Sequence, residues 1–398
     1  MKVITDRKKI EEVFERGVIS QVLPEKEELL KRFSSGERLR IYIGADPTST
    51  SLHLGHAQNY MVLEDFRKLG HEVIVLFGDF TAQIGDPTDK TTARKQLTEE
   101  EVKKNVKGWT DQIRPLMDFE DKENPPRVLF NSEWLSKMTW KDELELASNL
   151  TVQQMLERDM FEKRMEEGSP IYLHEFQYPL MQGYDSVAMD VDIELCGTDQ
   201  IFNALVGRTL LKRYKNKEKF VVATKLMEDP KTGELMSKSK GTGIFCASDP
   251  NEMYGAVMGQ TDEMTRLFLL SNTRLPLKEI EEIMKLEPME AKSRAALEIV
   301  KIFHGEESAK NAQEEFDSVF RKKGVPDDIK EIKLKKEDSL PEKLIEEGLI
   351  ASKSEWRKLV EQGAVREGEE KITDIDFMPE KTTVLKIGKR RFVKISLQ

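Results

Sequence analysis

The fold is decided by the stretch Tyr42-Ile43-Gly44-Ala45-Asp46-Pro47-Thr48-Ser49-Thr50-Ser51-Leu52-His53-Leu54-Gly55-His56. An apolar strand over 39–43 enters it, and a helix leaves it in which Val62, Phe66 and Leu69 recur at helical spacing until Gly70. A second, fully apolar strand follows at 73–77. This β-α-β order predicts an α/β domain with a Rossmann-like parallel sheet.

The rest of the chain predicts three further parts. Charged helical segments over about 95–170 indicate an insertion into the sheet, which resumes with a strand at 192–195, so the α/β domain spans 1–240. Helical periodicity continues over 241–325, and a Gly/Pro-containing, highly charged linker covers 326–340. The segment 341–398 predicts a small α+β module with a helix-turn-helix and strands at 384–387 and 391–395. The N-terminal segment is predicted to be helical to about Arg32.

Composition excludes several classes of protein. Charged residues make up 34% of the 398 residues and the formal net charge is −10, which does not suit a protein coated with nucleic acid. Two cysteines are too few for a disulfide framework and are typical of a reducing compartment, so we expect a cytoplasmic protein. No stretch approaches the roughly 20 apolar residues of a membrane span. The five histidines and two cysteines show no zinc-ligand spacing.

Two short motifs point to phosphate chemistry. His53-x-Gly55-His56 lies at a predicted helix N-terminus, where unpaired N–H groups and the helix dipole favour an anion such as a nucleotide phosphate. The second motif, Leu235-Met236-Ser237-Lys238-Ser239-Lys240-Gly241, has the hydroxyl and ammonium groups of a loop that closes over a polyphosphate. Either motif alone is more often ordinary surface. The two together in one α/β chain favour a nucleotide-binding enzyme.

These motifs resemble the two signatures of the class I aminoacyl-tRNA synthetases, and the chain most resembles the bacterial tyrosyl-tRNA synthetases. The resemblance includes Gly-x-Asp-Pro-Thr over 44–48, Ile84-Gly85-Asp86-Pro87, Tyr178-x-x-x-Gln182-x-x-Asp185 and Gly197-x-Asp199-Gln200. It implies a tyrosine-tRNA ligase that forms tyrosyl-adenylate and pyrophosphate from L-tyrosine and ATP, then transfers tyrosine to the terminal ribose of tRNA(Tyr). It also implies Mg²⁺ with the ATP and a homodimer whose interface includes the insertion.

The resemblance assigns roles to individual residues. Tyr42 and Asp185 read the phenol hydroxyl, and without that hydroxyl buried polar groups would go unpaired. The full tyrosine-binding set is Tyr42, Asp86, Tyr178, Gln182, Asp185 and Gln200. The ATP-binding set is Asp46, Thr48, His53, Gly55, His56, Gly197, Asp199, Ser237, Lys238 and Ser239. The residues that would stabilise the charge developing in the transition state, called the catalytic set, are His53, His56, Lys90, Arg94 and Lys238.

The stretches 351–365 and 385–392 of the C-terminal module resemble a small RNA-binding motif called alpha-L. From residue 381 to the C-terminus there are six basic residues and no acidic ones, a local phosphate-binding patch in an acidic protein. The implied RNA-binding residues are Lys353, Arg357, Lys389, Arg390 and Arg391. The region 241–325 is the implied anticodon-binding domain.

The chain departs from the family pattern at four places. Leu235 replaces the first lysine of the second signature, which leaves its effect on turnover open. Ile43 and Asn59 replace residues that lie near the ribose in relatives, and the acidic run over 366–370 adds negative charge beside the RNA-binding strand.

Three alternatives stay open on the sequence alone. A tryptophanyl-tRNA synthetase shares both signatures, but Tyr42, Asp185 and the C-terminal module argue against it. An RNA-binding protein descended from a synthetase would not need the complete amino-acid pocket. A stand-alone nucleotidyltransferase with a His-x-Gly-His motif would be shorter and would not depend on tRNA.

Overall fold

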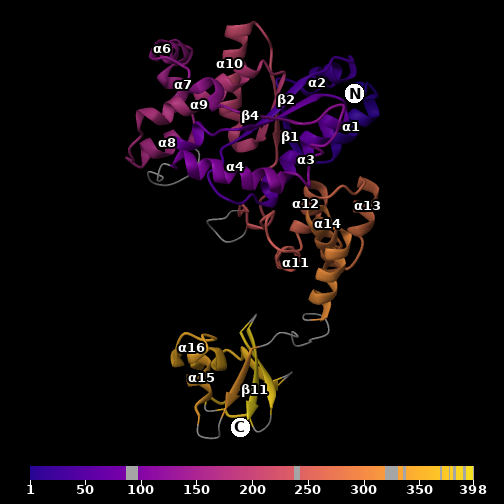
Figure 1. Ribbon diagram of the computed structural model, residues 1–398, viewed down its shortest axis with the longest axis vertical. Helices are drawn as coiled ribbons and strands as arrows, with labels where there is room; N and C mark the ends of the chain where they lie inside the picture. The colour runs from indigo at the N-terminus through magenta and orange to yellow at the C-terminus, as the bar shows by residue number, and fades with distance from the viewer. Residues whose placement is uncertain are drawn as a thin grey trace. The chain divides into compact units, whose positions relative to one another are not determined.

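The computed structural model describes residues 1–86, 97–236, 243–318, 330–334, 338–367, 370–375, 377–379, 382–388 and 391–397. They form two compact units, Met1–Lys310 and Asn311–Gln398 (Figure 1). The predicted domain division within residues 1–325 stays a prediction. No described helix combines the length and the apolar character needed to cross a lipid bilayer.

The first unit is built on a six-stranded sheet with the order β1-β6-β5-β2-β3-β4. Its strands are β1 Ile19–Leu23, β2 Arg40–Ala45, β3 Glu72–Phe77, β4 Arg127–Phe130, β5 Ile193–Gly197 and β6 Phe220–Thr224. Strands β2 to β6 pair in parallel, which confirms the predicted parallel α/β sheet. Strand β1 runs antiparallel to β6 at the edge of the sheet.

One local prediction about this sheet is wrong. The N-terminal helix does not continue to Arg32, because Gly17 adopts a left-handed φ of 88° after α1, and the segment after it, which contains Ile19 and Val22, forms β1. The segment 95–170 is mostly helical, as predicted, but it also contains β4, which pairs with β3. The tandem prolines Pro125 and Pro126 directly before β4 exclude a helix at that point.

Helices cover both faces of the sheet. Those of the first unit are α1 Arg7–Glu15, α2 Lys26–Ser34, α3 Leu54–Lys68, α4 Glu99–Ile113, α5 Ser132–Leu135, α6 Trp140–Ala147, α7 Val152–Leu156, α8 Asp159–Glu166, α9 Leu173–Met189, α10 Ile201–Lys215, α11 Pro250–Met258, α12 Met264–Asn272, α13 Leu277–Ile283 and α14 Pro288–Phe316, whose last residues pass into the second unit. Short 3₁₀ turns η1 Thr81–Gln83 and η2 Thr198–Gln200 follow β3 and β5. The region predicted to be helical beyond residue 241 contains α11 to α14, with a backbone kink at Gly305.

Alternation along the strands separates the two faces of the sheet. One set of side chains, including Ile41, Val73, Val75 and Ile193, belongs to the main core with α1, α2 and α3. The intervening residues point to the other face, where Tyr42, Ile74 and Leu76 form a second cluster with residues at the end of α9. Tyr42 is therefore directed away from the main core, toward the face that α9 and α10 cover.

The second unit contains the predicted helix-turn-helix and a five-stranded sheet with the order β7-β11-β10-β8-β9. Its elements are α15 Leu340–Glu346, α16 Lys353–Glu361, β7 Glu331–Leu334, β8 Val365–Glu367, β9 Glu370–Lys371, β10 Thr383–Ile387 and β11 Arg391–Leu397. Trp356 of α16 is buried in its core. Strand β7 pairs in parallel with β11, so residues 331–334, predicted to be linker, belong to this sheet.

Candidate functional site

The predicted site residues gather at the carboxyl edge of the parallel sheet. Asp46 follows β2, Gly78 follows β3, and Asp199 and Gln200 follow β5 in η2. Helix α9 crosses nearby and carries the Tyr178, Gln182 and Asp185 motif. Ligands of open α/β sheets bind at this edge, so the topology unites motifs that lie more than a hundred residues apart in the sequence.

Asp185 is a buried carboxylate held by two donors from the segment after β4. Its oxygens accept hydrogen bonds from Trp134 Nε1 at 2.8 Å and Asn131 Nδ2 at 3.4 Å. Burial raises the pKa of Asp185 well above its usual range, and the Trp134 and Asn131 donors oppose that rise. The pKa of Tyr42 is raised by burial and by the nearby carboxyls of Glu194 and Asp185. The predicted phenol-reading pair thus shares one buried environment.

Asp46, a predicted ATP-binding residue, is hydrogen-bonded to a predicted tyrosine-binding residue. Its carboxylate accepts hydrogen bonds from Tyr178 Oη at 2.9 Å and Thr81 Oγ1 at 2.7 Å. Gly78 makes this arrangement possible, because a Cβ there would lie 2.0 Å from Asp46 Oδ1 and 2.3 Å from Thr81 Oγ1. The hydrogen bond from Tyr178 joins the two predicted sets.

Amide side chains connect the remaining predicted tyrosine-binding residues. Gln200 Nε2 donates to Asp86 Oδ2 at 2.8 Å. The buried Asn203 of α10 donates through Nδ2 to Gln200 Oε1 and to Gln182 Oε1, both at 2.9 Å. Asp86, Gln182 and Gln200 therefore hold one another in place through Asn203.

The two signature histidines cap α3 and are neutral at physiological pH. His53 Nδ1 accepts from the Gly55 amide at 3.1 Å, and His56 Nδ1 accepts from the His53 amide at 3.2 Å. Burial lowers the pKa of His53 to about 4, and burial with the neighbouring His53 lowers the pKa of His56 to about 3. Since each Nδ1 is an acceptor, each neutral ring carries its proton on Nε2. Both histidines can therefore act as neutral donors through Nε2–H.

Helix α4 holds the loop between β2 and α3 from outside. Asn105 Nδ2 donates to the carbonyl of Pro47 at 2.8 Å, and Trp109 Nε1 donates to that of Ser49 at 2.6 Å. Gln112 accepts from the Leu52 amide at 2.8 Å. These side chains satisfy backbone groups of the loop that contains Thr48 and fix its path.

The segments that flank the second signature join the first signature. The amide of Leu54 donates to the carbonyl of Ile244 at 3.0 Å, and that of Cys246 donates to the carbonyl of Leu52 at 2.9 Å. Within the second signature, the amide of Met236 donates to the carbonyl of Met227 at 2.7 Å, which ties it to the segment after β6. The predicted residues Ser237, Lys238 and Ser239 lie outside the described residues, as do Lys90 and Arg94.

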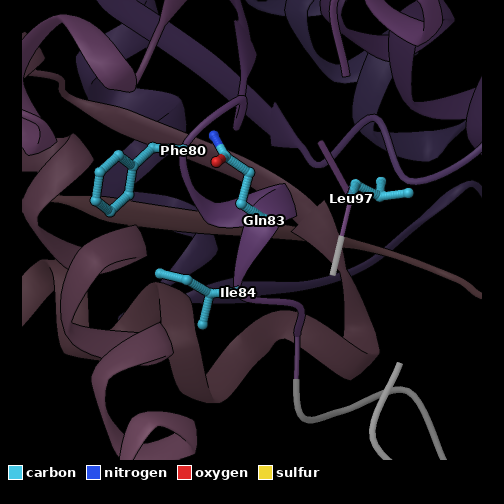
Figure 2. Close-up of a pocket in the computed structure, with 4 residues that line it drawn as sticks. All are labelled: Phe80, Gln83, Ile84 and Leu97. Atoms are coloured by element: carbon cyan, nitrogen blue, oxygen red, sulfur yellow. The ribbon is translucent and has the colours of Figure 1, made fainter. Parts of the chain in front are cut away.

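A pocket of about 230 Å³ lies between η1 and the start of the segment leading to α4. Figure 2 shows its lining, with Phe80, Gln83 and Ile84 from the turn around η1 and Leu97 from before α4. All four of these described side chains are uncharged.

The predicted RNA-binding residues in the second unit have different surroundings. Arg357 is exposed, and Lys353 Nζ pairs with Glu342 at 2.6 Å. Arg391 is engaged internally, since its guanidinium donates twice to Glu355 Oε1 at 3.0 Å and also to the carbonyl of Leu349. Lys389 and Arg390 lie outside the described residues.

Sequence reasoning missed several residues that support the site. Asn131 and Trp134 were missed because no strand was predicted at β4, which places them at the sheet edge. The apolar run after the two prolines at 125–126 was the signal that could have revealed that strand. Gly78 was predicted only to end the strand at 73–77, and Asn203 gave no sequence signal, since only the fold brings it to the site.

Comparison with known proteins identifies close relatives over nearly the whole chain. Residues 34–321 match the family described as tRNA synthetases class I (W and Y). The tyrosine–tRNA ligase of Carboxydothermus hydrogenoformans is 44% identical over 96% of this chain and 97% of its own. That of Thermotoga maritima is 42% identical over 96% of both chains. The fold resembles a C-terminally truncated mitochondrial tyrosyl-tRNA synthetase of Aspergillus nidulans with a TM-score of 0.68, at 24% identity over 78% of this chain and 94% of that one.

Proposed function

The chain belongs to the class I tyrosyl-tRNA synthetases, and we propose that the residues gathered at its sheet edge activate L-tyrosine with ATP and pass it to tRNA(Tyr). The observation that carries the residue assignment is that Tyr42, Asp185, Tyr178, Gln182 and Gln200 lie in one hydrogen-bonded region that is buried around Tyr42 and Asp185. These residues come from β2, α9 and η2, and they include acceptors for both ends of a tyrosine.

The amino-acid site reads the phenol at one end and the ammonium at the other. Asp185 keeps acceptor capacity beyond its two donors and can accept the phenol proton, while the Tyr42 hydroxyl can donate to the phenol oxygen. Asp86, Tyr178 and Gln182 offer the substrate ammonium a carboxylate with neutral polar partners. Phenylalanine would leave the buried Tyr42 O–H and the remaining acceptor capacity of Asp185 without the hydrogen bonds that the phenol supplies, a cost that disfavours it.

The chemistry is positioning combined with neutralisation of charge. The tyrosine carboxylate attacks the α-phosphorus of ATP in line, the bond to the bridging oxygen of the β-phosphate breaks, and pyrophosphate leaves. His53 and His56 donate Nε2–H to the phosphoryl oxygens without carrying charge themselves. Lys90, Arg94 and Lys238 are proposed to stabilise the leaving pyrophosphate. A terminal ribose hydroxyl of the tRNA then attacks the tyrosyl carbonyl and AMP leaves.

The proposed reaction also uses Mg²⁺, which is expected to bind together with ATP. Among the described residues there is no group of three or more His, Cys, Asp or Glu side chains arranged to hold a metal ion. We propose that Mg²⁺ binds together with ATP, as the family resemblance implies. The reaction takes place in the cytoplasm, as expected for an enzyme that charges tRNA for protein synthesis.

Two surfaces support the proposed macromolecular partners. Six of the strongly exposed large apolar side chains lie within residues 140–173: Trp140, Leu144, Val152, Met165, Tyr172 and Leu173. These residues belong to α6, α7, α8 and the start of α9, or lie next to them, and Figure 1 shows α6, α7 and α8 near α9. Exposed apolar side chains of this kind suit burial in a homodimer. The second proposed surface is for tRNA. Helices α11 to α14 and the second unit are proposed to contact it, and the second unit would do so through Lys353, Arg357, Lys389, Arg390 and Arg391.

The proposal is tested by ATP–pyrophosphate exchange with the purified full-length chain, offering tyrosine, phenylalanine and tryptophan separately. Exchange with tyrosine alone is expected, followed by charging of tRNA(Tyr). Exchange with tryptophan would overturn the assignment of the amino-acid site. No exchange with any of the three would favour a tRNA-binding role without catalysis.

A further inference from the structure

A buried ion pair lies behind the amino-acid site and has no role in the function proposed so far. Lys219, directly before β6, and Glu194, in β5, are 0% and 2% exposed, and their charged groups are in direct contact. Two buried charges are costly unless they are paired and their remaining hydrogen-bonding groups are satisfied. The hydrogen-bond partners of Lys219 and Glu194 therefore show which other side chains this ion pair holds in place.

The ammonium end of the pair reaches Tyr42 through one serine. Lys219 Nζ donates to Ser186 Oγ at 2.8 Å, and Ser186 Oγ lies 3.0 Å from Tyr42 Oη. Ser186 is fully buried on α9, next to Asp185. Since an ammonium group only donates, Ser186 must accept from Lys219. Its own proton can go to Tyr42 Oη at 3.0 Å or to Glu194 Oε2 at 3.5 Å, and the shorter contact favours Tyr42.

The carboxylate end of the pair reaches the opposite end of the amino-acid site. Glu194 Oε1 accepts from Gln182 Nε2 at 3.1 Å, and Gln182 continues through Asn203 to Gln200 and Asp86. One buried pair thus connects the proposed phenol-reading tyrosine with the proposed ammonium-binding residues. Replacing either charge would disturb both ends.

The helix contact between α9 and α10 is shaped around this pair. A Cβ at Gly207 of α10 would lie 2.5 Å from Lys219 Nζ and 2.8 Å from Ser186 Oγ. Any larger residue at position 207 would displace the ammonium group or the serine. Gly207 therefore leaves the space that the Lys219 side chain occupies.

We propose that Lys219 and Ser186 are positioning residues that orient the Tyr42 hydroxyl for tyrosine recognition. Lys219 donates to Ser186, Ser186 donates to Tyr42 Oη, and the Tyr42 O–H is left to point at the substrate phenol oxygen. The substrate hydroxyl then meets a donor in Tyr42 and an acceptor in Asp185. This inference rests on the proposed activation of tyrosine and extends it to the groups that set its specificity.

The test compares Ser186→Ala with a matched control. Ser293→Ala removes the same kind of partner, because Ser293 Oγ is 2.8 Å from the hydroxyl of buried Tyr254 in the helical region of the first unit. Steady-state ATP–pyrophosphate exchange is measured with tyrosine and with phenylalanine. We expect Ser186→Ala to lower the ratio of the kcat/KM values for tyrosine and phenylalanine by about 2- to 10-fold, the range for one hydrogen bond. Ser293→Ala should leave that ratio unchanged.

Lys219 is tested by a neutral replacement of the whole pair, Lys219→Met with Glu194→Gln, which avoids leaving one buried charge alone. It should lower the same ratio, and adding Ser186→Ala to it should lower the ratio no further, since both changes break one relay. An unchanged ratio in folded Ser186→Ala, or full additivity of the two changes, would overturn the inference. Failure of the wild-type chain to exchange with tyrosine would instead overturn the proposed function.

Discussion

Trp134 provides a sharp test of the phenol-reading site, because its indole N–H is the shorter of the two hydrogen bonds to buried Asp185. Trp134→Phe keeps a large aromatic side chain and removes only that donor. A hydrogen bond to a charged group contributes about 1.5–3 kcal/mol, so kcat/KM for tyrosine should fall roughly 10- to 100-fold. The assay is ATP–pyrophosphate exchange over a range of tyrosine concentrations, with kcat and KM reported separately.

The same substitution should move the pH dependence in a defined direction. The Trp134 donor holds the pKa of Asp185 below the value that burial alone would impose, so its removal raises that pKa further. The ionised carboxylate of Asp185 accepts a hydrogen bond from the substrate phenol. This ionised form is lost as the pH falls through the pKa of Asp185. The rise in KM for tyrosine on acidification should therefore begin at a higher pH in Trp134→Phe than in the wild-type chain.

A matched control is available in the second unit. Trp356 is buried and its Nε1 donates to the carbonyl of Ile375 at 2.8 Å. Trp356→Phe loses an equivalent indole donor but should leave pyrophosphate exchange unchanged, because that step does not involve tRNA. If Trp134→Phe were as active as Trp356→Phe at limiting tyrosine, the assignment of Asp185 to the phenol would be refuted.

Three other perturbations test the site, the core and the proposed dimer. Gly78→Ala should displace Asp46 and lower pyrophosphate exchange at least 10-fold, whereas Gly255→Ala, where a Cβ meets nothing within 4 Å, should not. Burial lowers the pKa of His71 to about 4, below its value of about 6.5 when unfolded, so its contribution to stability is full above pH 6.5 and is lost as the pH falls toward 4. His71→Asn should therefore reduce the loss of unfolding free energy between pH 7.5 and pH 5, measured with urea, by about 2 kcal/mol; an identical loss would contradict the buried, neutral histidine. Leu173→Asp should shift the sedimentation coefficient from a dimer to a monomer, and an unchanged value would place the interface elsewhere.

Local pattern predicted the parts of the fold that are set locally. The strands β2 and β3 and the helix α3 between them were evident, since apolar periodicity and Gly70 define their limits. Strands β1, β4 and β6 were not predicted. Strands β1 and β4 are short and owe their conformation to pairing at an edge of the sheet, whereas the apolar run of β6 over 220–224 lies inside the sheet and was not singled out. Missing β4 also hid part of the site, since the residues after it support the proposed phenol site.

The site shows the same division between local and long-range information. The motifs named the residues that would touch substrate, but the groups that hold those residues come from elsewhere in the chain and have no motif of their own. Asn203 and Lys219 resemble ordinary polar residues of a helix and of a loop until the fold buries them. Their roles follow from tertiary contacts alone.

Contacts of the first signature extend this reasoning to the helical region. The carbonyl of Leu54 accepts from Asn272 Nδ2 of α12 at 2.9 Å, while the amide of Leu54 bonds to Ile244 beyond the second signature. Leu54 lies between the two histidines that cap α3. A displacement of α12 would therefore act directly on the backbone that positions His53 and His56. The helical region is thus part of what builds the proposed catalytic site, which agrees with its inclusion in the same compact unit.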